Sequence, residues 1–197
     1  MAFVRIIAGT FKHRPLTSPP SKTTRPITDR VKQSVFDALA IAVGFEGVRV
    51  LDVFAGTGSI GLECLSRGAR EAVFVEQDRS ALAALRNNIE ALGVKASSKV
   101  VAADVFTRRD IWGGAMGSFD LIFFDPPYPM FDDAKAALVL DATISVSATN
   151  ALKEDGVLLV RTRTGLDMQR LEIAKLIRRR QEYGSMAMNW LTRGPAT

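Results

Sequence analysis

The chain has 197 residues, 47% of them hydrophobic, so it is long enough to bury one full core and leaves little length for a second. We therefore expect a single domain over residues 1–197. No stretch approaches the roughly 20 uninterrupted apolar residues of a membrane span, and the first residues lack the apolar run of a signal peptide. A protein of the cytoplasm without membrane contact is expected.

The chain has one cysteine, Cys64, which excludes an intramolecular disulfide. Its one histidine, His13, leaves little from which to build a metal site.

Charge is divided unevenly along the chain. Residues 1–32 carry seven basic side chains and one acidic side chain. Residues 33–160 carry eleven basic and seventeen acidic side chains, and residues 161–197 carry eight basic and three acidic ones. An acidic centre with basic ends fits a core that binds a cationic ligand and presents its ends to a polyanion. We therefore divide the chain into a basic N-terminal extension, 1–32, and a catalytic core, 33–197.

The apolar pattern predicts one α/β architecture. A short strand is expected at 3–8, and a helix at 29–40 with Thr28 as its N-cap. Further helical patterns follow at 59–67 and 80–92. Five strand-like runs alternate with helices, and their spacing suits right-handed crossovers and a parallel sheet. These runs are 48–53, 72–75, 99–102, 121–124 and 157–160. Residues 176–182 and 186–191 predict a final antiparallel hairpin.

Two basic segments have open interpretations. Between Gly9 and Thr28 the composition is rich in Pro, Ser, Thr, Lys and Arg with little periodicity, which predicts a flexible basic loop that orders on RNA. The cluster Arg178 to Arg180 fits either RNA contact or the charge that protects an edge strand from aggregation.

Residues 48–61, VRVLDVFAGTGSIG, predict a buried strand, a glycine-rich turn and the start of a helix. Gly56, Gly58 and Gly61 match the dinucleotide pattern G-x-G-x-x-G, so a nicotinamide cofactor is one possibility. Asp52 at the tip of the strand favours a different cofactor, because a fixed negative charge repels the pyrophosphate of a dinucleotide. S-adenosylmethionine presents an ammonium and a sulfonium instead, and a carboxylate favours both.

The tetrapeptide Asp125-Pro126-Pro127-Tyr128 directly follows an apolar strand. A carboxylate and a neighbouring carbonyl can accept both hydrogens of an exocyclic amine, which aims the nitrogen lone pair at an electrophile. The prolines favour an outward Pro126 carbonyl, and Tyr128 offers a face for stacking a flipped base. The alternative is a Pro-rich turn with a buried tyrosine.

The segments LDVFAGTGSIGLE and DPPY resemble the cofactor loop and catalytic motif of Rossmann-like amino methyltransferases. RIIAGTFKHRPL and TRPITDRVKQSVFDAL resemble one branch, the RsmD-type guanine-N2 methyltransferases of 16S ribosomal RNA. The resemblance runs from about Val4 to the region of Tyr183 and Gly184. It implies a class I S-adenosylmethionine-dependent fold: a mostly parallel seven-stranded sheet with helices on both faces. Two departures are Thr57, where Ser is frequent, and His13, where Gly is common.

The resemblance also implies roles for individual residues. Asp52 and the Gly56 to Gly58 turn hold the methionine portion of the cofactor, Glu76 its ribose, and Asp104 with Val105 its adenine. Asp125, Pro126, Pro127 and Tyr128 handle the guanine, and no metal takes part. Further cofactor contacts are expected from Phe54, Ala55, Thr57 and Gln77. RNA contacts are expected from Arg5, Lys12, Arg14, Arg25 and Arg30.

We therefore predict a monomeric enzyme that transfers a methyl group directly to guanine N2 of small-subunit ribosomal RNA, in naked RNA or in an assembling 30S particle. Two alternatives remain. DPPY also suits an adenine-N6 DNA methyltransferase, although no DNA-recognition domain is visible. A non-catalytic RNA-binding or assembly factor with the same fold is the other.

Overall fold

The computed structural model describes residues 4–19, 27–107 and 118–193. The chain divides into two compact units, Met1–Asp104 and Val105–Thr197, which we describe in turn. None of the helices in the described ranges is both long and apolar enough to cross a membrane. The organisation of the chain as one domain, with a basic extension before residue 33, stays a prediction.

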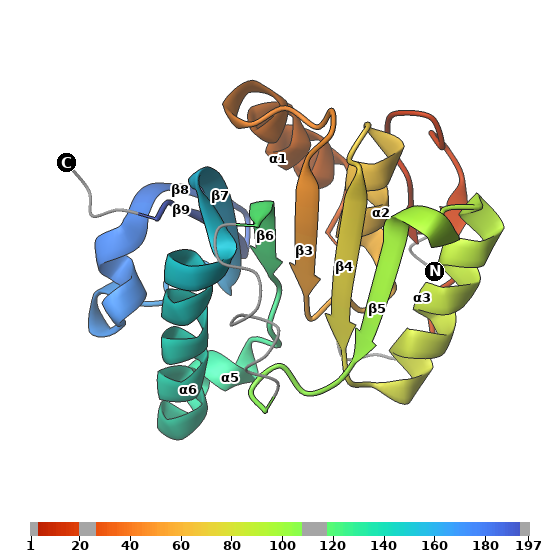
Figure 1. Cartoon of the computed structure of the whole chain (residues 1–197). Coiled ribbons are helices and arrows are strands. Elements are labelled where there is room, and N and C mark those ends of the chain that lie inside the picture. Colours follow the sequence, from red (N-terminus) through yellow and green to blue (C-terminus); the bar gives the residue numbers. More distant parts are fainter. Residues whose placement is uncertain (1–3, 20–26, 108–117, 194–197) are drawn as a thin grey trace. The chain divides into compact units, whose positions relative to one another are not determined.

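The first unit contains three parallel strands in the order β5-β4-β3 (Figure 1). They are β3 (Arg49–Val53), β4 (Glu71–Glu76) and β5 (Ser98–Ala102). The predicted runs are thus confirmed within one or two residues. Most positions of β3 and β4 are buried, as is typical of parallel strands, which read as continuous apolar runs.

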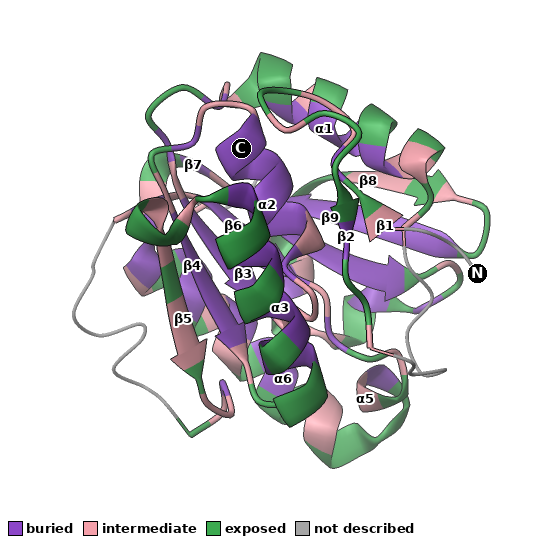
Figure 2. Cartoon of the chain, turned by 90° about the vertical axis from the view of Figure 1, so that its right-hand side faces the viewer, coloured by how far each residue is buried: buried purple, intermediate pink, exposed green. Residues whose placement is uncertain are grey.

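Three helices accompany these strands: α1 (Asp29–Ala42), α2 (Ser59–Ser66) and α3 (Arg79–Leu92). Thr28 caps α1 as predicted, since its hydroxyl accepts from the Val31 N–H at 3.4 Å. α2 packs against β3 and β4, and α3 against β5. Figure 2 shows α3 divided lengthwise into a buried and an exposed surface, as its apolar spacing predicts.

The N-terminal segment forms a small hairpin of β1 (Val4–Arg5) and β2 (Pro15–Leu16). The strand expected at 3–8 is therefore shorter than predicted. The flexible loop expected from Gly9 is wrong for residues 9–17, because side chains of α2 and α3 bind their backbone. Ser66 Oγ accepts from Phe11 N at 2.9 Å, and Asn88 Oδ1 accepts from Thr17 N at 2.8 Å. Residues 20–26 lie outside the described part of the chain.

His13 adopts a φ of 71°, in the left-handed region that glycine enters without steric cost. Its N–H bonds the Ile6 carbonyl at 2.8 Å and so closes the hairpin. The backbone therefore keeps a glycine-like conformation at the position where the resemblance led us to expect glycine.

The second unit has four strands in the order β6-β7-β9-β8. They are β6 (Phe119–Phe124), β7 (Leu152–Arg163), β8 (Ile177–Tyr183) and β9 (Met186–Leu191). β6 and β7 are parallel, and β9 runs antiparallel to both β7 and β8. The predicted hairpin is confirmed, and β7 is longer than the predicted run at both ends. With the three strands of the first unit, the described residues hold the seven predicted sheet strands.

Between β6 and β7 lie α5 (Pro129–Asp132) and α6 (Ala134–Val146), and a π-helical turn, Ser147–Ala151, follows α6. Asp133 caps α6 by accepting from Ala136 N at 2.7 Å. Short 3₁₀ turns complete the two units: Lys95–Ser97, Met168–Arg170 and Glu172–Leu176.

Candidate active site

The glycine loop reverses the chain directly after β3. Phe54, Gly56 and Gly58 have φ values of 60°, 56° and 79°. Left-handed backbone is uncommon for a bulky residue such as Phe54, and such strain concentrates at functional sites. Two hydrogen bonds support the turn, from Ala55 N to Val75 O at 3.1 Å and from Gly58 N to Ala55 O at 2.8 Å. The loop therefore has a fixed shape that leads into the N-terminus of α2.

Asp52 lies beneath this loop with an exposed fraction of 1%. Its Oδ2 accepts from Gly61 N in α2 at 2.9 Å. A Cβ at Gly61 would lie 2.4 Å from Cε1 of Phe74 and 3.2 Å from the same Asp52 oxygen, so only glycine fits. Asp52 thus fixes the start of α2 against β3 and is itself almost completely covered.

Glu76 at the end of β4 binds the backbone of two segments. Its Oε2 accepts from Gly56 N, and its Oε1 accepts from Gln77 N and Asp78 N, each at 2.8 Å. An ionised carboxylate offers about four acceptor positions, so one remains for a hydroxyl. Glu76 therefore joins the glycine loop to the start of α3, and Gln77 beside it is exposed.

The remaining predicted cofactor residues follow β5. Ala103 N donates to the carbonyl of Glu76 at 3.0 Å, which ties this connection to the end of β4. Asp104, the last residue of the first unit, is half-buried. Val105 opens the second unit and is buried.

The DPPY residues form the turn from β6 into α5. The Pro127 carbonyl accepts from Met130 N and the Tyr128 carbonyl from Phe131 N, each at 3.0 Å. No hydrogen bond among the described residues uses the Pro126 carbonyl. The Pro126 carbonyl is therefore an unused acceptor, and the residue as a whole is buried.

Arg161 on β7 is a residue of this site that the sequence analysis missed. Its Nε lies 2.6 Å from Oδ1 of Asp125, and its Cζ lies 5.6 Å from the centre of the Tyr128 ring. The Nε–H does not point at Oδ1, so the contact is a charge pair rather than an aligned hydrogen bond. A signal was available, because Arg161 is the first charge after the apolar run of a parallel strand, where ligand-binding residues gather.

Burial and Arg161 act on the two DPPY side chains in opposite directions. Removal of water raises the pKa of Asp125, and the Arg161 charge lowers that pKa in part. The pKa of Tyr128 is raised, also by burial first, so its hydroxyl stays protonated at neutral pH.

The predicted RNA-binding residues have different surroundings. Arg5 forms a half-exposed ion pair with Asp29 at 2.7 Å, and Arg14 Nη2 donates to the Ala91 carbonyl at 2.9 Å. Lys12 and Arg30 are exposed, and within the described residues neither side chain has an ion pair or hydrogen bond. Arg25 lies outside the described residues.

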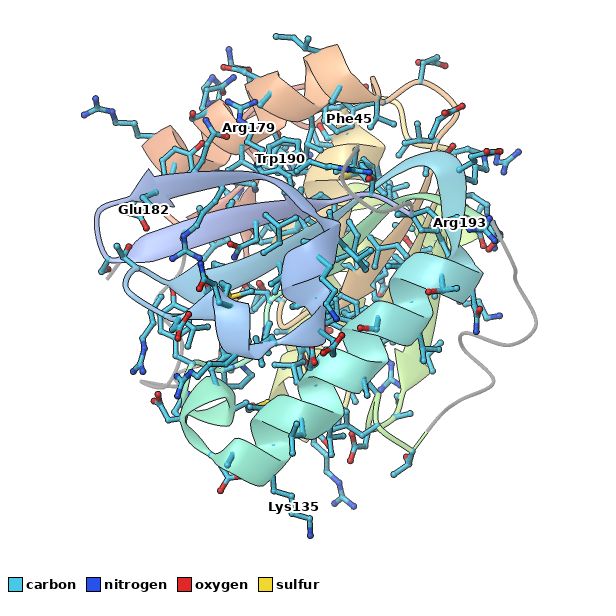
Figure 3. The ribbon with its side chains drawn as sticks, turned by 90° about the vertical axis from the view of Figure 1, so that its left-hand side faces the viewer. Phe45, Lys135, Arg179, Glu182, Trp190 and Arg193 are labelled. Atoms are coloured by element: carbon cyan, nitrogen blue, oxygen red, sulfur yellow. The ribbon has the colours of Figure 1, made fainter. Side chains whose placement is uncertain are left out.

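Each arginine of β8 has at least one neutral contact, and Arg180 also pairs with Glu182 at 3.3 Å. Arg179 lies over the Trp190 ring with its Cζ 5.6 Å from the ring centre (Figure 3). Arg178 Nε donates to Thr192 Oγ1 at 2.8 Å, and Arg180 Nη1 donates to Asn189 Oδ1 at 2.9 Å.

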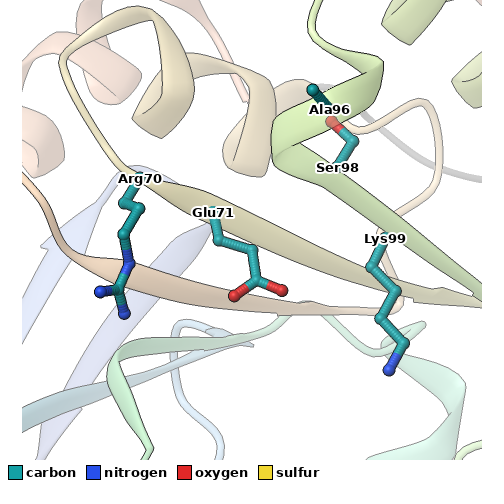
Figure 4. A pocket seen from close by; sticks show the side chains of 5 residues that line it. All are labelled: Arg70, Glu71, Ala96, Ser98 and Lys99. Carbon is teal, nitrogen blue, oxygen red and sulfur yellow. The ribbon is translucent and has the colours of Figure 1, made fainter.

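A surface pocket of the first unit does not coincide with the predicted site. It is lined by Arg70, Glu71, Ala96, Ser98 and Lys99 (Figure 4). These residues lie at the amino ends of β4 and β5, whereas Asp52 and Glu76 lie toward the carboxyl ends of β3 and β4. Over the ranges that the structure describes, no group of three or more Cys, His, Asp or Glu side chains is arranged to hold a metal ion.

Comparison with known proteins gives consistent matches along the chain. The family model described as Conserved hypothetical protein 95 matches residues 4–191. A protein from Bacillus subtilis named putative rRNA methyltransferase YlbH is 32% identical, over 92% of this chain and 94% of its own. The ribosomal RNA small subunit methyltransferase D of Haemophilus influenzae is 34% identical, over 81% of this chain and 78% of its own.

Solved structures share the fold. A putative methyltransferase, yhhF, from Escherichia coli has a TM-score of 0.78 at 26% identity, covering 99% of this chain and all of its own. A 16S rRNA N2 G1207 methyltransferase from Thermus thermophilus, solved with AdoMet and guanosine, has a TM-score of 0.64 at 24% identity. That match covers 86% of this chain and 44% of the other. The predicted Rossmann-like α/β methyltransferase fold is therefore confirmed.

Proposed function

The chain belongs to the family described as Conserved hypothetical protein 95, the RsmD family of ribosomal RNA methyltransferases, and we propose that it methylates the exocyclic N2 of a guanine in small-subunit ribosomal RNA. S-adenosylmethionine is the donor. The single observation that carries this proposal is the DPPY turn, in which the Asp125 carboxylate and an unused Pro126 carbonyl follow the same strand.

The residues of the first unit fit S-adenosylmethionine. Gly56 has a φ of 56° and open space where a Cβ would stand, so the loop backbone can approach a ligand closely. The buried charge of Asp52 favours a cationic amino acid moiety, and the remaining acceptor position of Glu76 suits a ribose hydroxyl. Asp104, which follows β5, holds the adenine.

When bound, S-adenosylmethionine supplies an electrophilic methyl group: a nitrogen–carbon bond forms as the carbon–sulfur bond breaks, and the electron pair of the broken bond stays on sulfur. Asp125 and the Pro126 carbonyl accept the two N2 hydrogens, which takes the nitrogen lone pair out of conjugation with the ring. Tyr128 holds the flipped base by stacking. One N2 proton leaves to water after transfer, so positioning and electrostatics supply most of the acceleration.

The test is to incubate the protein with methyl-labelled S-adenosylmethionine and, in separate reactions, naked 16S RNA, assembling small subunits or duplex DNA. The nucleosides are then identified by mass spectrometry. N2-methylguanosine from RNA is the expected product. N6-methyladenine from DNA would overturn the substrate assignment, and absence of label in every reaction would favour a binding or assembly factor.

A matched pair of variants separates binding from chemistry. Asp125→Ala should lower the transfer rate by about 10²–10³-fold and leave the affinity for S-adenosylmethionine, measured by calorimetry, unchanged. Asp52→Ala should weaken that affinity. An active Asp125→Ala protein would contradict the assigned role of the carboxylate.

A further inference from the structure

We propose that Arg161 is a positioning residue for methyl transfer, which holds the Asp125 carboxylate charged and fixed beside the Tyr128 ring. The inference rests on the proposed function of these two DPPY residues. Arg161 lies on β7, outside the DPPY motif, and would act together with Asp125 and Tyr128.

The register of the sheet brings the residues together. β6 and β7 are parallel with Phe124 opposite Val160, so the next residues, Asp125 and Arg161, emerge at the same edge. The side chain of Arg161 is 9% exposed and that of Asp125 is 26% exposed. A buried guanidinium 2.6 Å from a carboxylate oxygen interacts far more strongly than a solvated surface pair.

One arginine contacts two functional side chains. Its Nε lies 2.6 Å from Oδ1 of Asp125, while its Cζ lies 5.6 Å from the centre of the Tyr128 ring, within reach of a cation–π interaction. A shift of Arg161 would therefore change both the acceptor for the amine and the stacking surface for the base.

Asn189 of β9 fixes the strand on both sides of Arg161. Its Nδ2 donates to the Val160 carbonyl at 3.0 Å and to Thr162 Oγ1 at 3.1 Å, and Asn189 is completely buried. Arg180 Nη1 in turn donates to Asn189 Oδ1. The backbone that carries Arg161 is therefore held by a satisfied polar network, as a positioning residue requires.

The charge of Arg161 is needed because Asp125 is partly desolvated. Burial alone raises the pKa of Asp125 and favours the protonated acid, and Arg161 opposes this shift. A protonated carboxyl group donates through one oxygen and loses part of its capacity to accept an N–H. Arg163, two residues further along β7, pairs with Asp132 of α5. The residue opposite Arg161 on β9 is the neutral Met188.

The first experiment compares the pH dependence of single-turnover methyl transfer in wild type, Arg161→Met and Arg161→Lys. We expect Arg161→Met to be slower by about tenfold or more at neutral pH, to recover as pH rises, and to have its acid limb at higher pH than wild type. Arg161→Lys should restore the acid limb, because it keeps the positive charge, but not the full rate. Equal acid limbs in wild type and Arg161→Met would overturn the proposal.

A second experiment does not depend on turnover. Carbon-13 NMR of labelled aspartate side chains, with Asp125→Asn used to assign the signal, follows the titration of Asp125 in cofactor-free protein. The titration midpoint should be higher in Arg161→Met than in wild type, and equal midpoints would contradict the role of Arg161. If Arg161→Met does not fold, Arg161→Gln, which keeps polar atoms without charge, replaces it in both experiments.

These readouts separate the proposal from the function beneath it. If wild type methylates a base other than guanine, the assigned substrate is wrong while the comparison of acid limbs still tests Arg161. If wild type transfers no methyl group, the NMR titration still shows whether Arg161 keeps Asp125 ionised.

Discussion

The side-chain amide of Asn88 in α3 donates to the backbone carbonyl of Thr57, in the centre of the glycine loop, at 3.0 Å. The same amide bonds both polar backbone groups of Thr17. Its Oδ1 accepts from the Thr17 N–H at 2.8 Å, and its Nδ2 donates to the Thr17 carbonyl at 3.0 Å. Asn88 is almost fully buried. One side chain thus joins the basic N-terminal segment to the proposed cofactor loop.

Asn88→Ala should loosen the loop and weaken S-adenosylmethionine binding. It removes three partly buried hydrogen bonds to the backbone of Thr17 and Thr57, which costs about 1–3 kcal/mol of stability. If about 1 kcal/mol of that cost falls on positioning of the loop, affinity falls about fivefold. Calorimetry with the cofactor and thermal unfolding measure the two effects.

Asn87→Ala is the matched control, because Asn87 is the preceding residue of α3 and is exposed. It should leave both affinity and melting temperature close to wild type. Cofactor affinity that is the same in Asn88→Ala and Asn87→Ala would show that the contact with Thr57 does not position the loop.

Glu63→Gln should be one of the most destabilising single changes in the first unit. The Glu63 carboxylate is completely buried and binds Lys32 Nζ and Arg67 Nε, each at 2.9 Å. It also accepts from Ile7 N at 2.9 Å and Ala8 N at 3.0 Å. Loss of its charge leaves buried cations uncompensated, at a cost of about 3–5 kcal/mol. Urea unfolding followed by circular dichroism measures the change.

Glu90→Gln on the exposed side of α3 serves as the reference for this substitution. It should change the free energy of unfolding by about 0.5 kcal/mol or less. Equal midpoints for the two variants would mean that the Glu63 cluster contributes no more than a surface charge.

Local patterns were enough to predict the strands, the glycine loop and the DPPY turn. Each depends on a short run of residues: an apolar run for β3, glycines for the reversal, prolines for the turn before α5. The capping of α1 by Thr28 belongs to the same class, since the cap and the N–H that it binds lie three residues apart.

Contacts between distant segments were not predictable in this way. Arg161 meets Asp125 only because β6 and β7 pair in one particular register, and no spacing within either segment encodes that register. The docking of the N-terminal segment was missed for a similar reason. Its partners Glu63 and Ser66 belong to α2, where a buried polar side chain is indistinguishable by composition from an exposed one.

Gly9→Ala should detach the N-terminal segment from α2. Gly9 has a φ of 78°, and a Cβ there would lie 1.8 Å from the Ser66 carbonyl oxygen, which accepts from Thr10 N. Backbone must move to relieve this overlap. Hydrogen exchange should then show faster exchange of the Thr10 and Phe11 amides.

Gly93→Ala separates steric overlap from backbone strain. Gly93 at the end of α3 has a φ of 70° but open space around the added Cβ. It should cost only about 1 kcal/mol, through the left-handed conformation, and leave the Thr10 amide protected. Equal protection of Thr10 in both variants would contradict the tight approach of Gly9 to Ser66.

The double variant Lys12→Ala/Arg30→Ala should weaken RNA binding mainly at low salt. Both side chains are exposed, and neither has an ion pair or hydrogen bond within the described residues, so they are available to phosphates. Each phosphate contact contributes about one unit to the slope of log affinity against log salt concentration, so the slope should fall by about two. Filter binding of 16S RNA over a range of salt concentrations measures this slope.

Arg86→Ala, at an exposed arginine of α3 outside the N-terminal extension, is the control and should keep the wild-type slope. A reduced slope in the control with a wild-type slope in the double variant would move the RNA surface away from the N-terminal extension.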